Sequence, residues 1–164
     1  LAVFSLKTRE IDRQWSAHSD AVIMSLLFLP KGEERKESDE ESEVWSVGED
    51  GCIYIWRERD CTLLDVLTSI RGVAQPRYYT ILARGSSGKV YCGTYFGQVV
   101  VWDGEQRMVL ETIGEFTTVE VTALHITTKQ NGTDVIVCCF RDRRIAVYEC
   151  SLPSFSSTLS TFVF

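Results

Sequence analysis

Histidine, proline and positive charge are all scarce in this sequence. Its 164 residues include two histidines and three prolines, and 17 lysines and arginines stand against 23 aspartates and glutamates, for a net charge of −6. An acidic chain lacks the basic face that attracts a nucleic-acid backbone or an anionic membrane. We therefore expect no nucleic-acid partner, and the same balance disfavours a membrane.

Long hydrophobic runs are also absent. The longest uncharged apolar run in the first half is Ala21–Pro30, whereas a membrane-spanning helix needs about 20 residues. No basic-then-apolar leader is visible. Because the sequence does not begin with methionine, we expect it to be a piece of a longer protein.

The six cysteines have neither the spacing of a metal site nor that of a disulfide framework. Four of them lie in apolar, β-like runs: Cys52, Cys92, Cys138 and Cys139. Free cysteine is among the most buried residue types. With no CxxC pair, and only His18 and His125 as imidazole ligands, we favour buried free thiols over a disulfide or a zinc site. We expect no metal and no cofactor, and a reducing compartment, which is the cytoplasm or alternatively the nucleus.

An internal repeat organises the chain. Three segments share one pattern of apolar strand, tight turn and second apolar strand: VWSVGEDGCIYIW at 44–56, VYCGTYFGQVVVW at 90–102 and IVCCFRDRRIAVY at 136–148. Their final aromatic residues recur every 46 residues: Trp56, Trp102 and Tyr148. Phe4 falls in the same column once a charged insertion at 31–43 is allowed for.

This period predicts the fold class. Repeats of ~40–45 residues plus loops, built from β-branched and aromatic strands, are typical of four-stranded propeller blades. We predict an all-β β-propeller of antiparallel blades, with about three and a half blades in this chain. The predicted units are strands c and d of a preceding blade (1–15), a first full blade (16–67), a second (68–113) and a third (114–164). In the first blade, strands a to d are expected at 21–29, 44–47, 52–57 and 62–67.

The first blade resembles a WD40 repeat. His18 falls in the Gly-His position of that family, although Ala17 replaces the glycine. Asp50 and the following glycine occupy the turn between strands b and c, and Trp56 follows Asp50 by six residues. Ser46 lies in strand b. The resemblance implies a hydrogen-bonded network of His18, Ser46, Asp50 and Trp56, because a carboxylate buried in a turn needs donors.

The other two blades depart from the family pattern. The second keeps Trp102-Asp103, but Phe96 replaces the turn aspartate and Cys92 the strand-b serine. In the third blade four columns can be assigned: Glu115 for the histidine, Cys138 for the serine, Asp142 for the turn aspartate and Tyr148 for the tryptophan. We therefore expect the network in the first blade only.

The blade count implies a partner. Propellers of this family usually close with seven blades, and an open ring would leave apolar blade faces bare. We expect the remainder of the propeller to come from the same chain or from another one.

No catalytic constellation is apparent, so we predict that this chain is not an enzyme. His18 is assigned to the network, and His125 lies in an apolar strand. Gly85–Gly88 fits neither a phosphate loop nor a nucleophile elbow and is expected to be a turn. Asn131–Thr133 is expected to be a hairpin turn, with a glycan acceptor as the alternative.

The charged loop at 31–43 is expected to be disordered from its composition. Two interpretations stay open for it. It is either a solvated insertion or a loop regulated by phosphorylation at Ser38 and Ser42, which have acidic neighbours.

The resemblance also implies a binding face, where the b–c turns and the segments leading into strands a project together. The candidate partner-binding residues are Asp20, Glu49, Arg77, Tyr78, Tyr95, Glu120 and Arg141. We predict a non-enzymatic protein–protein interaction scaffold. The alternatives are a regulatory propeller appended to a signalling enzyme and a phosphoinositide-binding propeller that uses Arg141, Arg143 and Arg144.

Overall fold

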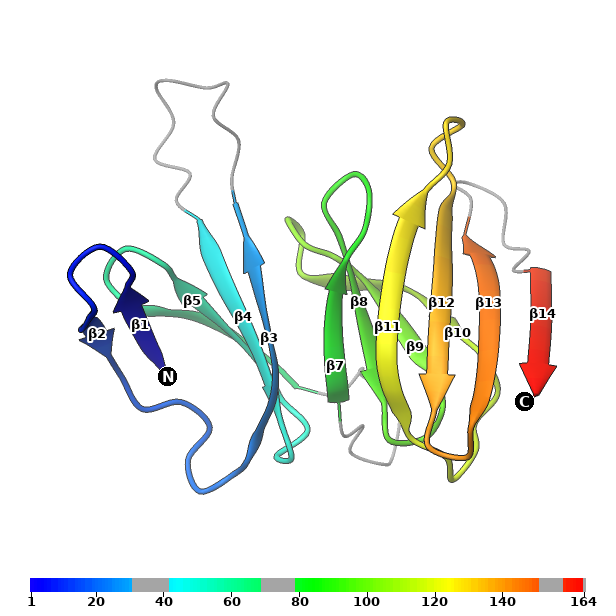
Figure 1. Ribbon diagram of the computed structural model, residues 1–164, viewed down its shortest axis with the longest axis horizontal. Coiled ribbons are helices and arrows are strands. Elements are labelled where there is room, and N and C mark those ends of the chain that lie inside the picture. Colours follow the sequence, from blue (N-terminus) through cyan, green and yellow to red (C-terminus); the bar gives the residue numbers. More distant parts are fainter. Residues whose placement is uncertain (31–41, 69–78, 151–157, 164) are drawn as a thin grey trace.

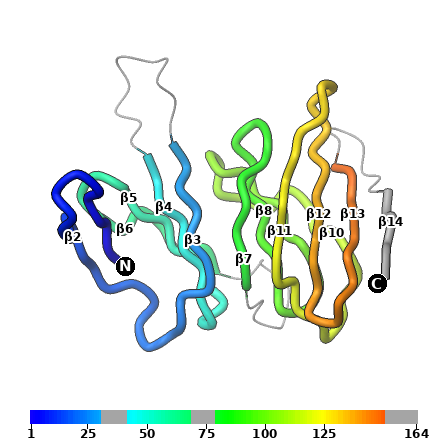
Figure 2. Tube along the Cα trace, in the orientation of Figure 1, coloured from blue at the N-terminus to red at the C-terminus, as the bar shows by residue number. Residues whose placement is uncertain are grey.

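The computed structural model describes residues 1–30, 42–68, 79–150 and the backbone of 158–163 (Figures 1 and 2). All regular structure in these ranges is β-strand, arranged in four antiparallel sheets. Within the same ranges, no helix has the length and apolar character needed to span a membrane.

One sheet has two strands and the other three have four. The half-blade consists of β1 (Ala2–Ser5) and β2 (Glu10–Gln14). Blade 1 consists of β3 (Ile23–Leu29), β4 (Glu43–Gly48), β5 (Ile53–Arg57) and β6 (Leu63–Leu67). Blade 2 consists of β7 (Tyr79–Arg84), β8 (Lys89–Thr94), β9 (Val99–Asp103) and β10 (Met108–Ile113). Blade 3 consists of β11 (Val121–Thr128), β12 (Asp134–Phe140), β13 (Arg144–Cys150) and β14 (Thr158–Val163).

The blades follow one another in space as they do in sequence. Figure 1 shows the half-blade (blue) at one end, blade 2 in the middle and blade 3 (yellow to red) at the other end. The first strand of each full blade lies innermost, so that β7 packs against β3 on one side and β11 on the other. The predicted all-β fold class of four-stranded propeller blades is confirmed.

Two hydrophobic cores lie between the blades. Trp45, Val47 and Ile55 of blade 1 pack against Val90 and other apolar residues of blade 2. The second core joins blade 2 to blade 3 through residues that include Tyr91, Val101, Ile136 and Cys138. Blade 2 is therefore covered on both faces, which explains why β8 and the first four residues of β9 are buried throughout.

The strands begin close to the expected positions. The inner strand of blade 1, expected from residue 21, starts at Ile23. The difference has a local cause, because the preceding residues form a turn in which the Ala21 amide donates to the His18 carbonyl at 3.1 Å. Asp20 has a φ of 59° in this turn, a left-handed conformation that a strand cannot contain.

Candidate interaction face

The turns between the second and third strands of the blades place three different side chains at equivalent positions. Glu49 follows β4, Tyr95 follows β8 and Arg141 follows β12. All three are exposed. The Glu49 amide donates to the carbonyl of Val22, just before β3, at 3.0 Å, and the Arg141 amide donates in the same way to Glu120, just before β11. These turns and the segments that lead into the inner strands form one surface, which we call the turn face.

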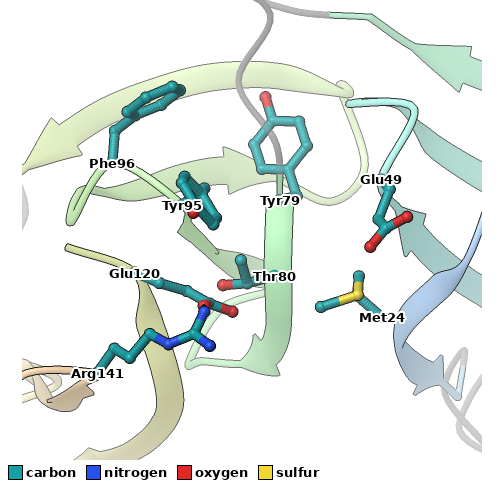
Figure 3. Close-up of a pocket in the computed structure, with 8 residues that line it drawn as sticks. All are labelled: Met24, Glu49, Tyr79, Thr80, Tyr95, Phe96, Glu120 and Arg141. Carbon is teal, nitrogen blue, oxygen red and sulfur yellow. The ribbon is translucent and has the colours of Figure 1, made fainter. Parts of the chain in front are cut away.

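A pocket of about 510 Å³ opens on the turn face (Figure 3). Its lining residues come from all three full blades: Met24, Glu49, Tyr79, Thr80, Tyr95, Phe96, Glu120 and Arg141. Figure 3 shows Glu49 and Met24 on one side and Tyr95, Glu120 and Arg141 on the other, with Thr80 on β7 between them.

Four of the seven candidate binding residues meet in this pocket: Glu49, Tyr95, Glu120 and Arg141. Asp20 is exposed in the turn before β3 but does not line it. Arg77 and Tyr78, like residues 31–41 of the charged loop, lie outside the described residues. Sequence reasoning missed Met24, Tyr79, Thr80 and Phe96. Met24 could have been found from the alternation of side chains along β3, because every second residue of this strand is exposed.

An aromatic cluster borders the pocket. The Phe96 and Phe116 rings stack with centroids 4.8 Å apart, and Tyr95 meets Phe96 edge-on at 5.8 Å. Glycine at position 97 permits this arrangement, because a Cβ there would lie 2.4 Å from the Thr117 Oγ1 atom. Tyr95 and Phe116 remain 44% and 58% exposed. Exposed aromatic side chains of this kind are typical anchors at protein interfaces.

Two of the three charged residues that line the pocket form an ion pair. The Arg141 guanidinium contacts the Glu120 carboxylate at 3.1 Å, with Glu120 largely buried and Arg141 71% exposed. Thr80 is buried, and its hydroxyl donates to the Val121 carbonyl at 2.6 Å, which ties β7 to β11. A hydrogen bond between blades 2 and 3 therefore holds Thr80 in the lining of the pocket, and Arg141 and Glu120 pair with each other.

The four residues of the expected network lie together in blade 1. His18 Nδ1 lies 2.9 Å from the Asp50 carboxylate, and Nε2 lies 2.9 Å from Ser46 Oγ. The Trp56 indole N–H donates to the same Ser46 oxygen at 2.9 Å. A carboxylate only accepts hydrogen bonds, so in the neutral ring Nδ1 carries the proton and Nε2 accepts from the Ser46 hydroxyl. Glycine at position 48 leaves room for the His18 ring, since a Cβ there would lie 2.6 Å from His18 Nδ1.

Blade 2 lacks the serine of this network. Cys92 stands where Ser46 stands in blade 1, ten residues before the tryptophan. The Trp102 indole nitrogen is buried and has no hydrogen-bond partner among the described residues. Burial raises the pKa of the Cys92 thiol well above its usual value, so this side chain behaves as a neutral, apolar one.

A different buried carboxylate joins blades 2 and 3. Asp134, at the start of β12, accepts hydrogen bonds from the Tyr91 hydroxyl and the Thr128 hydroxyl, each at 2.7 Å. The Lys89 ammonium lies 3.6 Å away and is itself buried. Burial alone would raise the pKa of Asp134, but hydrogen bonds from Tyr91, Thr128 and Ser86 outweigh it and lower the pKa below its ordinary value. No sequence motif pointed to this group.

The arginines considered for phosphoinositide binding are mostly engaged within the chain. Arg141 pairs with Glu120, and Arg144 contacts Asp142 at 2.6 Å while its guanidinium lies over the Phe140 ring. In the part of the chain that the structure describes, no group of three or more histidine, cysteine, aspartate or glutamate residues could hold a metal ion. All six cysteines are free thiols.

Comparisons with known proteins show the class of fold. No family model matches the sequence, and no curated protein matches it either. Among solved structures, the WD40 repeats of RRP9 match with a TM-score of 0.69 at 17% identity, over 91% of this chain and 40% of that chain. The structure of U3-55K matches with a TM-score of 0.67 at 18% identity, over 91% and 41%. The computationally designed Ika8 protein matches at 0.64 with 20% identity, over 96% and 42%.

These likenesses define the fold and not the activity. The chain folds as blades of a WD40-type β-propeller and spans 40–42% of the length of these solved structures.

Proposed function

We propose that this chain is a non-enzymatic protein-interaction scaffold, a segment of a larger WD40-like propeller that binds a protein partner at the turn face. The observation that carries this proposal is the pocket lined by residues of three blades and bordered by exposed aromatic side chains. The WD40-type fold supports it, because propellers present loops on a rigid framework and bind through them.

The chemistry of the described residues also fits binding better than catalysis. The one buried histidine, His18, uses both ring nitrogens in the contacts that hold blade 1 together. The buried Asp134 carboxylate is likewise taken up by hydrogen bonds between blades. The exposed side chains at the pocket include Tyr95, Arg141 and Met24, and tyrosine, arginine and methionine are enriched in protein interfaces.

Removing the exposed aromatic anchors tests this proposal. In the full-length protein, Tyr95→Ala combined with Phe116→Ala is expected to reduce partner recovery at least about tenfold, because interface aromatics commonly contribute the free energy that such a factor requires. Quantitative mass spectrometry of cross-linked complexes from the native source measures the recovery, and titration calorimetry with the purified partner confirms it.

The matched control lies on the outer strand of blade 2. Met108→Ala combined with Leu110→Ala removes two side chains of β10 that are 51% and 40% exposed, away from the turn face. Equal recovery of every partner by the wild type and both double variants would exclude the turn face as the binding surface.

A further inference from the structure

Among the described residues of the turn face, the acidic residues of blade 1 are the ones without a basic residue in the same segments. The two segments of blade 1 on this face, residues 16–22 and 48–52, contain Asp20, Glu49 and Asp50 but no lysine or arginine. The corresponding turn of blade 2, residues 94–98, is uncharged. In blade 3 the acidic groups are accompanied by arginines, two of which form ion pairs with them.

The two pocket carboxylates differ in their availability. Glu120 is already bound by the Arg141 guanidinium, and its side chain is only 14% exposed. Glu49 is exposed, and among the described residues no hydrogen bond or ion pair occupies its carboxylate. Its backbone is nevertheless held, because its amide donates to Val22. Among the described residues, the pocket thus presents one carboxylate without an ion pair at its blade 1 side, on a backbone that is held in place.

Apolar surface lies directly beside this carboxylate. Met24, 40% exposed on β3, shares the same side of the pocket with Glu49 (Figure 3). An acidic group next to an exposed thioether matches a side chain that ends in a cation and has an aliphatic stem. Arginine and lysine have this form, since both bury their methylene stems along apolar surface while the head stays in water.

We propose that the blade 1 side of the pocket binds a basic side chain, arginine or lysine, of a protein partner, with the cation beside Glu49 and the stem over Met24. This inference rests on the proposed function and adds the chemistry of the partner. The Arg141–Glu120 pair at the other side is an internal example of the same recognition. This pair also explains why the pocket should prefer a cationic side chain to an anionic one. Arg141 is already neutralised by Glu120 and offers little to an anionic ligand, and the chain as a whole carries a net charge of −6.

Peptides that differ in one side chain test the inference. The probes are fluorescein-labelled Gly-Ser-Gly-Xaa-Gly-Ser-Gly peptides in which Xaa is arginine, lysine, citrulline or glutamate, titrated into the full-length protein by anisotropy. Citrulline matches arginine in shape but is uncharged. We expect the arginine or lysine peptide to bind about two- to fivefold more tightly than the citrulline peptide, the range found for one solvent-accessible ion pair. The preference should shrink as salt is added.

Two isosteric variants assign the effect to one carboxylate. Glu49→Gln should abolish the preference for the cationic peptide, whereas Glu105→Gln, which removes an equal charge in the exposed turn between β9 and β10, should retain it. Glu49→Lys should instead favour the glutamate peptide, which a general loss of structure would not produce.

The inference is overturned if the citrulline peptide binds as tightly as the arginine and lysine peptides, if no peptide binds, or if Glu49→Gln and Glu105→Gln behave alike. These failures are distinct from failure of the proposed function. Loss of the partner in the Tyr95 and Phe116 double variant, without any preference for cationic peptides, would leave the scaffold in place and reject only the basic side chain.

Discussion

At the scale of single residues, one serine hydroxyl decides how well a blade satisfies its buried polar groups. Ser46 forms hydrogen bonds with both the Trp56 indole and His18 Nε2. In blade 2, where Cys92 takes its place, the Trp102 indole has no hydrogen-bond partner in the part of the chain that the structure describes. A buried donor or acceptor without a partner costs about 1–3 kcal/mol. The two blades therefore have the same strand order but differ in how firmly their tryptophans are held.

Removing this hydroxyl should destabilise the fold. Ser46→Ala leaves both the indole N–H and the imidazole nitrogen without their hydrogen-bond partner, and we expect the free energy of unfolding to fall by about 2 kcal/mol. Urea denaturation followed by tryptophan fluorescence measures the change. The exposed Ser16→Ala serves as the control and should change stability by less than about 0.5 kcal/mol. An unchanged midpoint for Ser46→Ala would mean that water replaces the hydroxyl.

At the scale of elements, the turns between second and third strands require a left-handed residue at their third position. Gly51, Gly97 and Arg143 occupy it, with φ values of 73°, 78° and 72°. Glycine adopts this conformation without steric cost, whereas for a residue with a Cβ it costs roughly 1–2 kcal/mol. This turn of the third blade therefore carries backbone strain that the equivalent turns of the first two blades avoid.

Relieving this strain should stabilise blade 3. Arg143→Gly is expected to raise the free energy of unfolding by about 0.5–1 kcal/mol, since the gain in the folded turn is partly offset by the flexibility of glycine in the unfolded chain. Arg143→Ala separates this effect from the loss of charge, because it keeps the Cβ and should bring no such gain. A shift of the urea midpoint that is the same for both variants would assign the change to the charge instead.

At the scale of the whole molecule, charged side chains link each blade to the next. Arg13 of the half-blade binds the Glu58 carboxylate at 2.8 Å, and Arg107 of blade 2 reaches Glu43 and Asp65 of blade 1. The buried Lys89 and Asp134 link blade 2 to blade 3. Separate hydrophobic cores lie between the blades. These ion pairs add polar contacts that connect each blade to its neighbour.

The link at Asp134 should make stability depend on pH. Its pKa is lowered in the folded protein by hydrogen bonds that outweigh burial, so its contribution is complete above the unfolded value of about 3.9 and is lost as pH falls through the folded value. We expect Asp134→Asn to cost about 2–3 kcal/mol at pH 7, with the difference from wild type shrinking below about pH 4. Urea titrations from neutral to acidic pH test this. A difference that stays constant with pH would show that the carboxylate charge is not what stabilises the joint.

Apolar side chains of blade 1 stay partly uncovered in the described part of the chain. Leu26 and Phe28 of β3 are each 52% exposed. The expectation that the remainder of a propeller covers such faces is consistent with matched structures of more than twice this length, and it stays a prediction.

The amino-acid sequence by itself determined the blades, and its resemblance to WD40 repeats implied the blade 1 turn network. The 46-residue interval, the turn residues and the apolar strand pairs are local features, and local hydrogen bonding and side-chain alternation convert them directly into antiparallel strands. The resemblance also implied that Glu49, Tyr95 and Arg141 lie on one face, because they occupy equivalent turn positions in successive blades.

Only the tertiary structure decided which side chains meet across blades. Nothing near Asp134 in the sequence identifies Tyr91 and Lys89 as its partners, since these residues are more than 40 positions away and meet it only through blade packing. Met24 looked like one more apolar strand residue, and it became part of the pocket because β3 turns that side away from the core. Burial and charge pairing between blades depend on how the sheets stack. A repeat pattern specifies the strands of each blade, but it does not specify which side chains of the neighbouring blade will contact them.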